Sequence, residues 1–138
     1  MQKVILAMAI AFSLSPEANS QVTDDATSQR KEMIFTKVEV EAKFKGGDAA
    51  WRDFLQNNLL ANTPIINGAP TGTYTVIVKF VVSRSGTVGA VIAETNHGFG
   101  MEAEAIRLIK KTPKWIAAIN GGHVVSSYRR QPITFVVP

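Results

Sequence analysis

The clearest hydrophobic pattern in this chain is a strict alternation from Thr73 to Ser83. Tyr74, Val76, Val78, Phe80 and Val82 share one face of this segment, while Thr75, Lys79 and Ser83 fall on the other. The following residues, Ser83-Arg84-Ser85-Gly86, have the composition of a tight turn, and Thr87 to Thr95 form a second run with strand-like composition. The pattern therefore predicts a β-hairpin over residues 73–95.

Two other segments have the spacing of amphipathic helices. The first repeats apolar residues at Trp51, Phe54, Leu55 and Leu59, after two glycines and with Asp48 as its predicted N-cap. Residues 62–72 are rich in Asn, Pro and Gly and predict an irregular loop after it.

The second predicted helix follows the glycine-rich loop at residues 96–100. Its buried stripe is Met101, Ala105, Leu108 and Ile109. Glu102 and Glu104 lie in its first turn and Lys110 and Lys111 in its last, so the charges match the helix dipole. Thr112-Pro113 ends the helix, and Trp115 follows.

The last apolar run, Val124 to Val137, alternates over a long distance and contains Pro132 in its middle. Proline has no N–H to donate to a central ladder, so this segment is predicted to be an edge strand. Two interpretations follow for Tyr128, Arg129, Arg130, Gln131, Pro132, Ile133, Thr134, Phe135 and Val136. Arg129, Arg130 and Pro132 protect an exposed edge, or the edge binds an extended peptide.

The order of these elements predicts the fold class. A short extended arm with apolar residues at Val38, Val40 and Ala42 precedes helix, hairpin, helix and final strand. We expect an α+β fold in which two helices pack on one face of a three-stranded antiparallel sheet. Trp51 and Trp115 are expected to pack in or against its core rather than to stack on a ligand.

The N-terminal segment predicts export. Lys3 precedes an apolar run, Val4 to Leu14, that is shorter than the roughly 20 residues needed to span a bilayer. Ala18-Asn19-Ser20 offers a cleavage site for a signal peptide over residues 1–20. Residues 21–36 are then expected to form a polar tail and residues 37–138 the folded domain. An uncleaved inner-membrane anchor is the alternative.

Composition and motif search exclude several classes of site. The chain has no cysteine, which excludes disulfides, thiol nucleophiles and thiolate metal sites. Its net charge of +4 is scattered, without the basic stripe of a nucleic-acid-binding protein. His97 and His123 lie in glycine-containing loops without a second ligand at metal spacing. We therefore expect no catalytic residue, no metal, no cofactor and no small-molecule substrate.

Taken in order, several short motifs resemble the C-terminal domain of the TonB family of energy transducers, in the form common among Bacteroidetes. They are Phe44-Lys45-Gly46-Gly47-Asp48, Asn67-Gly68-Ala69-Pro70, Gly98-Phe99-Gly100, Lys110-Lys111-Thr112-Pro113-Lys114-Trp115, Asn120-Gly121-Gly122 and Tyr128-Arg129-Arg130-Gln131-Pro132-Ile133-Thr134-Phe135. The resemblance spans residues 38–137. It implies a periplasmic, non-enzymatic domain of the Gram-negative envelope. It also implies that the final strand recruits the TonB box of an outer-membrane transporter by strand addition.

Two departures from a full TonB protein leave a second function open. The apolar run is short, and the polar tail contains no proline, where the resemblance implies a membrane anchor and a long Pro-rich spacer. Fully extended, the proline-free stretch from Gln21 to about Glu32 reaches about 40 Å at roughly 3.5 Å per residue. A non-transducing assembly module, or one that forms a homodimer through the same edge strand, is therefore the alternative.

Overall fold

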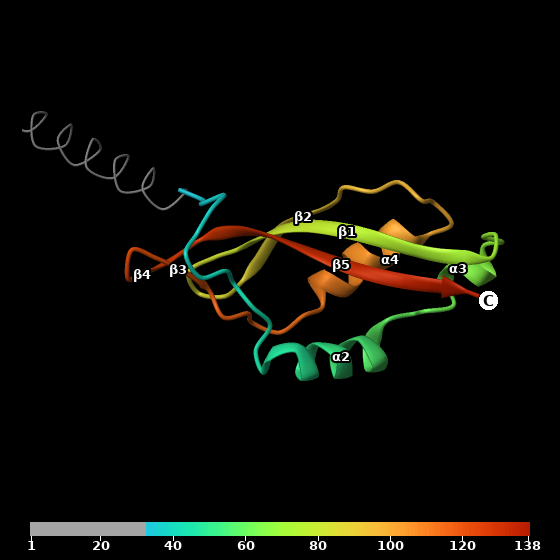
Figure 1. Ribbon diagram of the computed structural model, residues 1–138, viewed down its shortest axis with the longest axis horizontal. Helices are drawn as coiled ribbons and strands as arrows, with labels where there is room; N and C mark the ends of the chain where they lie inside the picture. Colours follow the sequence, from blue (N-terminus) through green and yellow to red (C-terminus); the bar gives the residue numbers. More distant parts are fainter. Residues whose placement is uncertain (1–32) are drawn as a thin grey trace, which may run out of the picture. The chain divides into compact units, whose positions relative to one another are not determined.

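Three antiparallel strands form the centre of the computed structural model, which describes residues 33–138 (Figure 1). The elements are α2 (Gly47–Asn58), α3 (Thr63–Ile66), β1 (Gly72–Val82), β2 (Val88–Ala93), α4 (Met101–Lys110), β3 (Ala118–Asn120), β4 (His123–Val125) and β5 (Ser127–Val137). The expected signal peptide over 1–20, and the polar tail except for its last residues, lie outside this part of the chain.

The main sheet has the strand order β2-β1-β5. β1 and β5 pair over eleven residues in an unbroken register, from Gly72 opposite Val137 to Val82 opposite Ser127. The hairpin predicted from the alternation is confirmed, because β1 and β2 pair around a turn at residues 83–87. β1 alternates as expected, with Val76, Val78, Phe80 and Val82 buried.

Both predicted helices pack on one face of the sheet, as the fold class required. The apolar stripe of α4, Met101, Ala105, Leu108 and Ile109, is fully buried. α2 contributes the partly buried side chains of Trp51, Phe54 and Leu55, and none of its residues is fully buried. Thus α4 supplies fully buried side chains to the core, whereas α2 packs at its periphery.

Two local predictions were wrong, one about the start of the first helix and one about the loop after it. Asp48 does not cap α2. The N-cap is Gly46 in a left-handed conformation with φ of 94°, and Asp48 lies inside the first turn. The segment 62–72 is not entirely irregular, since Thr63–Ile66 forms the short helix α3 with Pro64 in its first turn. Proline is compatible with that position because a helix's first N–H groups have no internal partner.

The final apolar run is also two strands rather than one. β4 pairs with β3 around the turn at Asn120-Gly121-Gly122, and β5 begins after Ser126. Ser126 accepts hydrogen bonds from two other segments, through its carbonyl from Phe35 N–H and through its hydroxyl from Arg84 N–H. These bonds hold the chain where it passes from one sheet to the other.

The residues before α2 form the extended arm that the sequence predicted. Val40 exchanges two backbone hydrogen bonds with Ile119 of β3, and Lys43 does the same with Ile116. Farther back, Phe35 forms a parallel bridge to Ser127 at the start of β5. The arm therefore connects the small sheet to one end of the large one.

Aromatic side chains meet around Trp115, which is 4% exposed. Its ring lies 5.1 Å from Phe80, 5.5 Å from Phe44 and 6.0 Å from Trp51, measured between centroids. Its indole N–H donates to the hydroxyl of Thr112 at 2.9 Å. The expectation that both tryptophans pack in or against the core is confirmed.

An ion pair between buried Glu104 and the more exposed Arg107 connects α4 to the end of α2. Glu104 receives both Nε and Nη2 of Arg107 at 2.7 Å, and Glu104 Oε2 also accepts the Leu60 N–H at 2.8 Å. Arg107 Nη2 donates to the carbonyl of Asn58 at 2.8 Å. Burial alone would raise the pKa of Glu104, but the bonds from Arg107 and Leu60 outweigh it and lower the pKa.

We predict that Trp115→Ala destabilises the fold by about 3–5 kcal/mol, the usual loss for a buried large aromatic side chain. The change removes the contacts with three aromatic rings and leaves a cavity. Urea denaturation followed by far-UV circular dichroism measures the free energy of unfolding. A melting temperature within one or two degrees of the wild type would contradict the buried packing of Trp115.

Gly86→Ala tests the close approach of the hairpin turn to Trp115. A Cβ on Gly86 would lie 2.2 Å from the carbonyl oxygen of Trp115, whose N–H already bonds to Gly86. Gly68→Ala is the matched control, because its φ of 82° resembles the 84° of Gly86 but nothing lies within 4 Å. We expect Gly86→Ala to cost about 1–3 kcal/mol more than Gly68→Ala. Equal losses would show that backbone strain alone matters.

The ion pair also predicts how stability depends on pH. The folded-state pKa of Glu104 is lowered, so its contribution is complete above the unfolded-state pKa of about 4.3. It is lost as the pH falls through the lower folded value. We expect Glu104→Gln to be less stable than the wild type at pH 7, with the difference shrinking below about pH 4. Urea titrations from pH 7 to pH 3 measure this, and a constant difference would refute it.

Candidate functional site

The outer side of β5 is an edge of the main sheet, as the sequence predicted. Pro132 lies opposite Ile77 of β1. Ile77 directs its own N–H and C=O toward β2, where the carbonyl accepts the Glu94 N–H at 2.8 Å. The missing N–H of Pro132 therefore faces away from β1, which explains why the unbroken register tolerates a proline.

The direction of every other N–H on β5 follows from the same alternation. The N–H of Tyr128 points outward and donates to the carbonyl of Phe35 at 3.0 Å. Residues two positions apart share a direction, so the N–H groups of Arg130, Thr134 and Val136 also point outward. The arm thus covers the edge at Tyr128, and the edge available to a partner begins at Arg130.

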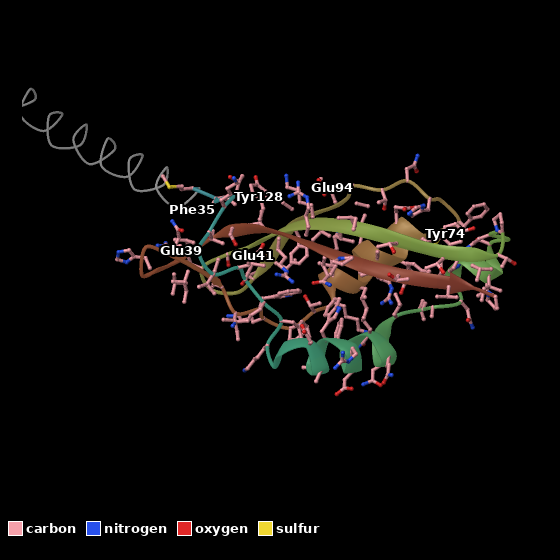
Figure 2. All side chains as sticks on the ribbon, viewed as in Figure 1. Phe35, Glu39, Glu41, Tyr74, Glu94 and Tyr128 are labelled. Carbon is pink, nitrogen blue, oxygen red and sulfur yellow. The ribbon has the colours of Figure 1, made fainter. Side chains whose placement is uncertain are left out.

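The side chains of β5 divide between the two faces of the sheet. Gln131, Ile133, Phe135 and Val137 face the core and are buried, while Arg130, Pro132, Thr134 and Val136 are exposed. Figure 2 shows Phe35 and Tyr128 at one end of β5 and Tyr74 near the other. The free backbone edge thus belongs to a strand whose side chains are packed in the core. It can therefore act as a rigid template for a further strand.

Arg129 has a structural role that the sequence did not reveal. Its Nη1 donates to the carbonyl of Ala42 at 2.9 Å and its Nη2 to Gln131 Oε1 at 3.2 Å. The guanidinium carbon lies 5.7 Å from the centre of the Trp115 ring. Arg129 was expected to protect the edge by its charge, but it binds the arm to the core.

Arg130 is held on the open face of the sheet. Its Nε donates to Glu94 Oε1 at 2.6 Å, and this hydrogen bond lowers the pKa of the Glu94 carboxyl. A cleft of about 560 Å³ on this face is lined by Thr36, Lys37, Glu41, Lys79, Tyr128 and Arg130. Lys79 Nζ lies 4.4 Å above the Tyr128 ring. The residues that line this cleft thus include three cations, Lys37, Lys79 and Arg130, and one carboxylate, Glu41.

Gln131 interacts with the edge through its side chain. Its Nε2 donates to the outward carbonyl of Pro132 at 3.2 Å. This carbonyl already has one partner, and its second lone pair can accept a donor from an added strand. The unmatched groups of the edge are consequently those of Arg130, Thr134 and Val136.

The second edge of the sheet, on β2, is a poorer template. β2 has six residues, and its register with β1 shifts between Lys79 and Val81. Ala90, at this bulge, adopts a positive φ of 50°. Bulges of this kind disturb the regular spacing of edge donors and acceptors. β5 therefore offers the longer and more regular of the two edges.

Both histidines are exposed. His97 lies in the loop before α4, as expected, whereas His123 is the first residue of β4 and not a loop residue. His97 Nε2 lies 2.8 Å from the carbonyl of Thr75, and Glu102 accepts the N–H groups of His97 and Gly98 at 2.9 Å each. Burial alone would raise the pKa of Glu102, but these bonds lower it. Within residues 33–138, no three His, Asp or Glu side chains gather as a metal site would require.

The sequence did not predict the contacts of the loop between α2 and α3. Glu104 and Arg107 were visible as a pair three residues apart on a helix, a common surface arrangement. Nothing in that spacing indicates that Glu104 is buried and bonds to Leu60. The partner residue is 44 positions away, so only the folded chain identifies it.

A comparison with protein families matched the part of the chain that forms the strands β1 to β5 and helix α4. Residues 73–137 match the family described as Gram-negative bacterial TonB protein C-terminal, which covers β1 through β5 and leaves out α2 and α3. No curated protein and no solved structure matched the chain. From residue 33 onward, none of the helices combines the length and the apolar character of a membrane span.

Domains of the matched family interact with TonB-dependent transporters of the outer membrane. The match begins one residue after the start of β1 and ends at the last residue of β5. It thus includes the long edge strand and the hairpin that supports it. Over residues 73–137, the chain matches the TonB C-terminal family, the same family that its sequence motifs resemble.

Proposed function

We propose that the outer edge of β5 binds an extended segment, the TonB box, of an outer-membrane transporter by strand addition. The observation that supports this is the free edge from Arg130 to Val136, which only an extended chain can match. Its donors, the N–H groups of Arg130, Thr134 and Val136, have the two-residue spacing of a strand except at Pro132, which has no N–H.

An added strand would lie about 4.8 Å outside β5 and extend the three-stranded sheet to four strands. Main-chain hydrogen bonds would supply most of the affinity, and alternate side chains would supply specificity. Phe35 would limit the strand at one end, since its carbonyl already holds Tyr128. The bound segment is therefore short, about seven residues at roughly 3.3 Å each along Arg130 to Val136.

We further propose that the chain acts in the periplasm as a binding module without enzymatic activity. The signal peptide expected over residues 1–20 supports export. A role in protein interaction agrees with the matched family. A homodimer joined through the same β5 edge is the competing use of this surface, because two copies could pair there antiparallel.

We predict that Thr134→Pro weakens peptide binding by about tenfold or more, because it removes an outward donor and leaves a peptide carbonyl unmatched. The N–H of Thr134 does not bond to β1, so the sheet itself should persist. The measurement is titration of the full chain with a synthetic TonB-box peptide from a transporter of the same organism. Backbone NMR would follow the amides from Tyr128 to Val136.

Ala93→Pro is the matched control on the opposite edge. The Ala93 N–H also points away from β1, since the neighbouring Glu94 donates to Ile77. It should therefore leave peptide affinity unchanged. Shifts confined to the helices, or equal losses in both variants, would contradict strand addition to β5. Sedimentation at several concentrations separates the homodimer, which would compete with the peptide.

A further inference from the structure

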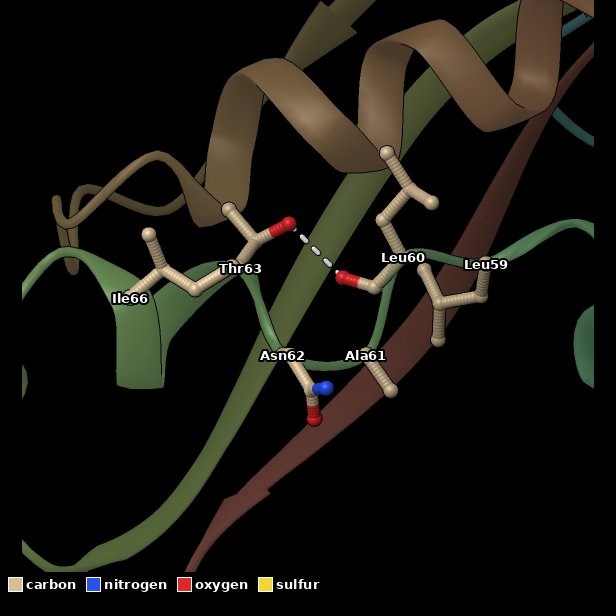
Figure 3. A pocket seen from close by; sticks show the side chains of 6 residues that line it. All are labelled: Leu59, Leu60, Ala61, Asn62, Thr63 and Ile66. Carbon is tan, nitrogen blue, oxygen red and sulfur yellow. Dashed lines mark hydrogen bonds between the residues drawn. The ribbon is translucent and has the colours of Figure 1, made fainter.

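A pocket opens beside the C-terminal half of β5, between the end of α2 and α3 (Figure 3). It has a volume of about 440 Å³ and is lined by Leu59, Leu60, Ala61, Asn62, Thr63 and Ile66. Leu60 is 60% exposed and Ile66 is 80% exposed. Two large aliphatic side chains thus stand open to solvent at one place, which is unfavourable unless something covers them.

The backbone of this pocket is fixed by hydrogen bonds. The N–H of Leu60 donates to buried Glu104, and the Leu60 carbonyl accepts the Thr63 hydroxyl at 2.7 Å. Figure 3 shows the second bond as a dashed line across the pocket. Arg107 holds the carbonyl of Asn58 just before the loop. The exposed side chains therefore belong to a preformed surface, not to a loosely held loop.

The pocket lies close to β5. Helix α3 contacts β5, and Pro64 of α3 is fully buried. Leu59 packs against the core cluster that contains Ile133 and Phe135 of β5. Figure 3 shows β5 passing behind Leu59 and Ala61. The pocket thus lies on the helix side of the sheet and close to β5, the strand that carries the outward N–H groups of Thr134 and Val136.

From this arrangement we infer that the pocket binds an apolar side chain of the strand that is added to β5. The inference rests on the proposed function. Unmatched N–H groups at Thr134 and Val136 require an extended chain, and every second side chain of such a chain faces the helix side. One of these side chains meets Leu60 and Ile66. The pocket therefore fixes the register of the bound strand.

The residues that line the pocket determine which side chain of the added strand it prefers. Leu59, Leu60, Ala61 and Ile66 supply aliphatic surface, and the hydroxyl of Thr63 is already bonded to Leu60. Among the residues lining the pocket there is no charged group to compensate an ionised side chain, so burying one there is unfavourable. An aliphatic side chain of the partner is consequently preferred over alanine, which leaves the pocket unfilled, and over a charged residue.

The test combines pocket variants with a peptide series. The same TonB-box peptide is made with each residue replaced in turn by alanine, and each Kd is measured against the full chain. In the wild type, one apolar position should cost about tenfold on replacement. In the double variant Leu60→Ser and Ile66→Ser, the parent peptide should bind about tenfold more weakly, and the loss at that position should disappear.

Val124→Ser is the matched control, because Val124 is 52% exposed on β4, near the opposite end of the sheet from α3 (Figure 1). It should behave as the wild type. If melting shows that the double variant does not fold, Ile66→Ser alone repeats the test at the most exposed position.

Hydrogen exchange at Thr134 and Val136 separates the two proposals. If the peptide protects both amides but the double variant keeps the wild-type affinity and alanine profile, the pocket inference is wrong and strand addition stands. If the peptide fails to protect these amides in the wild type, strand addition itself is wrong, and the pocket inference fails with it.

Discussion

The unbroken register between β1 and β5 is the constraint on which the rest of the structure depends. Eleven consecutive pairs leave no bulge in β5, so the direction of each of its backbone groups is fixed by parity. The same parity sends Ile133 and Phe135 into the core and turns the N–H groups of Thr134 and Val136 outward. The pairing of β1 with β5 therefore determines both which side chains enter the core and which backbone groups are free at the edge.

Contacts at the first residues of β5 fix where its free edge begins. Arg129 ties the arm to the core through Ala42, and Phe35 ends the free edge at Tyr128. On the opposite side, Glu104 and Arg107 hold the loop that follows α2. Long-range hydrogen bonds thus define both ends of the proposed binding site.

The two edges of the sheet illustrate how one domain can admit a partner strand while limiting unwanted pairing. β2 is short, bulged at Ala90 and packed against α4, all of which disfavour a further strand. β5 is long and regular, and its proline removes a donor at only one outward position. Pro132 therefore weakens the edge without closing it. A pocket such as that near Leu60 adds selectivity that main-chain bonds cannot supply.

The sequence by itself determined the features that depend on local pattern. Alternation over 73–83 predicted β1, helical spacing predicted α2 and α4, and Pro132 predicted an edge strand, because each signal arises from neighbouring residues. The tertiary structure alone decided the break at Ser126, the buried Glu104 and the role of Arg129. These depend on partners such as Phe35, Leu60 and Ala42, which lie 44 to 91 positions away along the chain. No local pattern records which distant backbone group will satisfy a given side chain, since the fold brings them together.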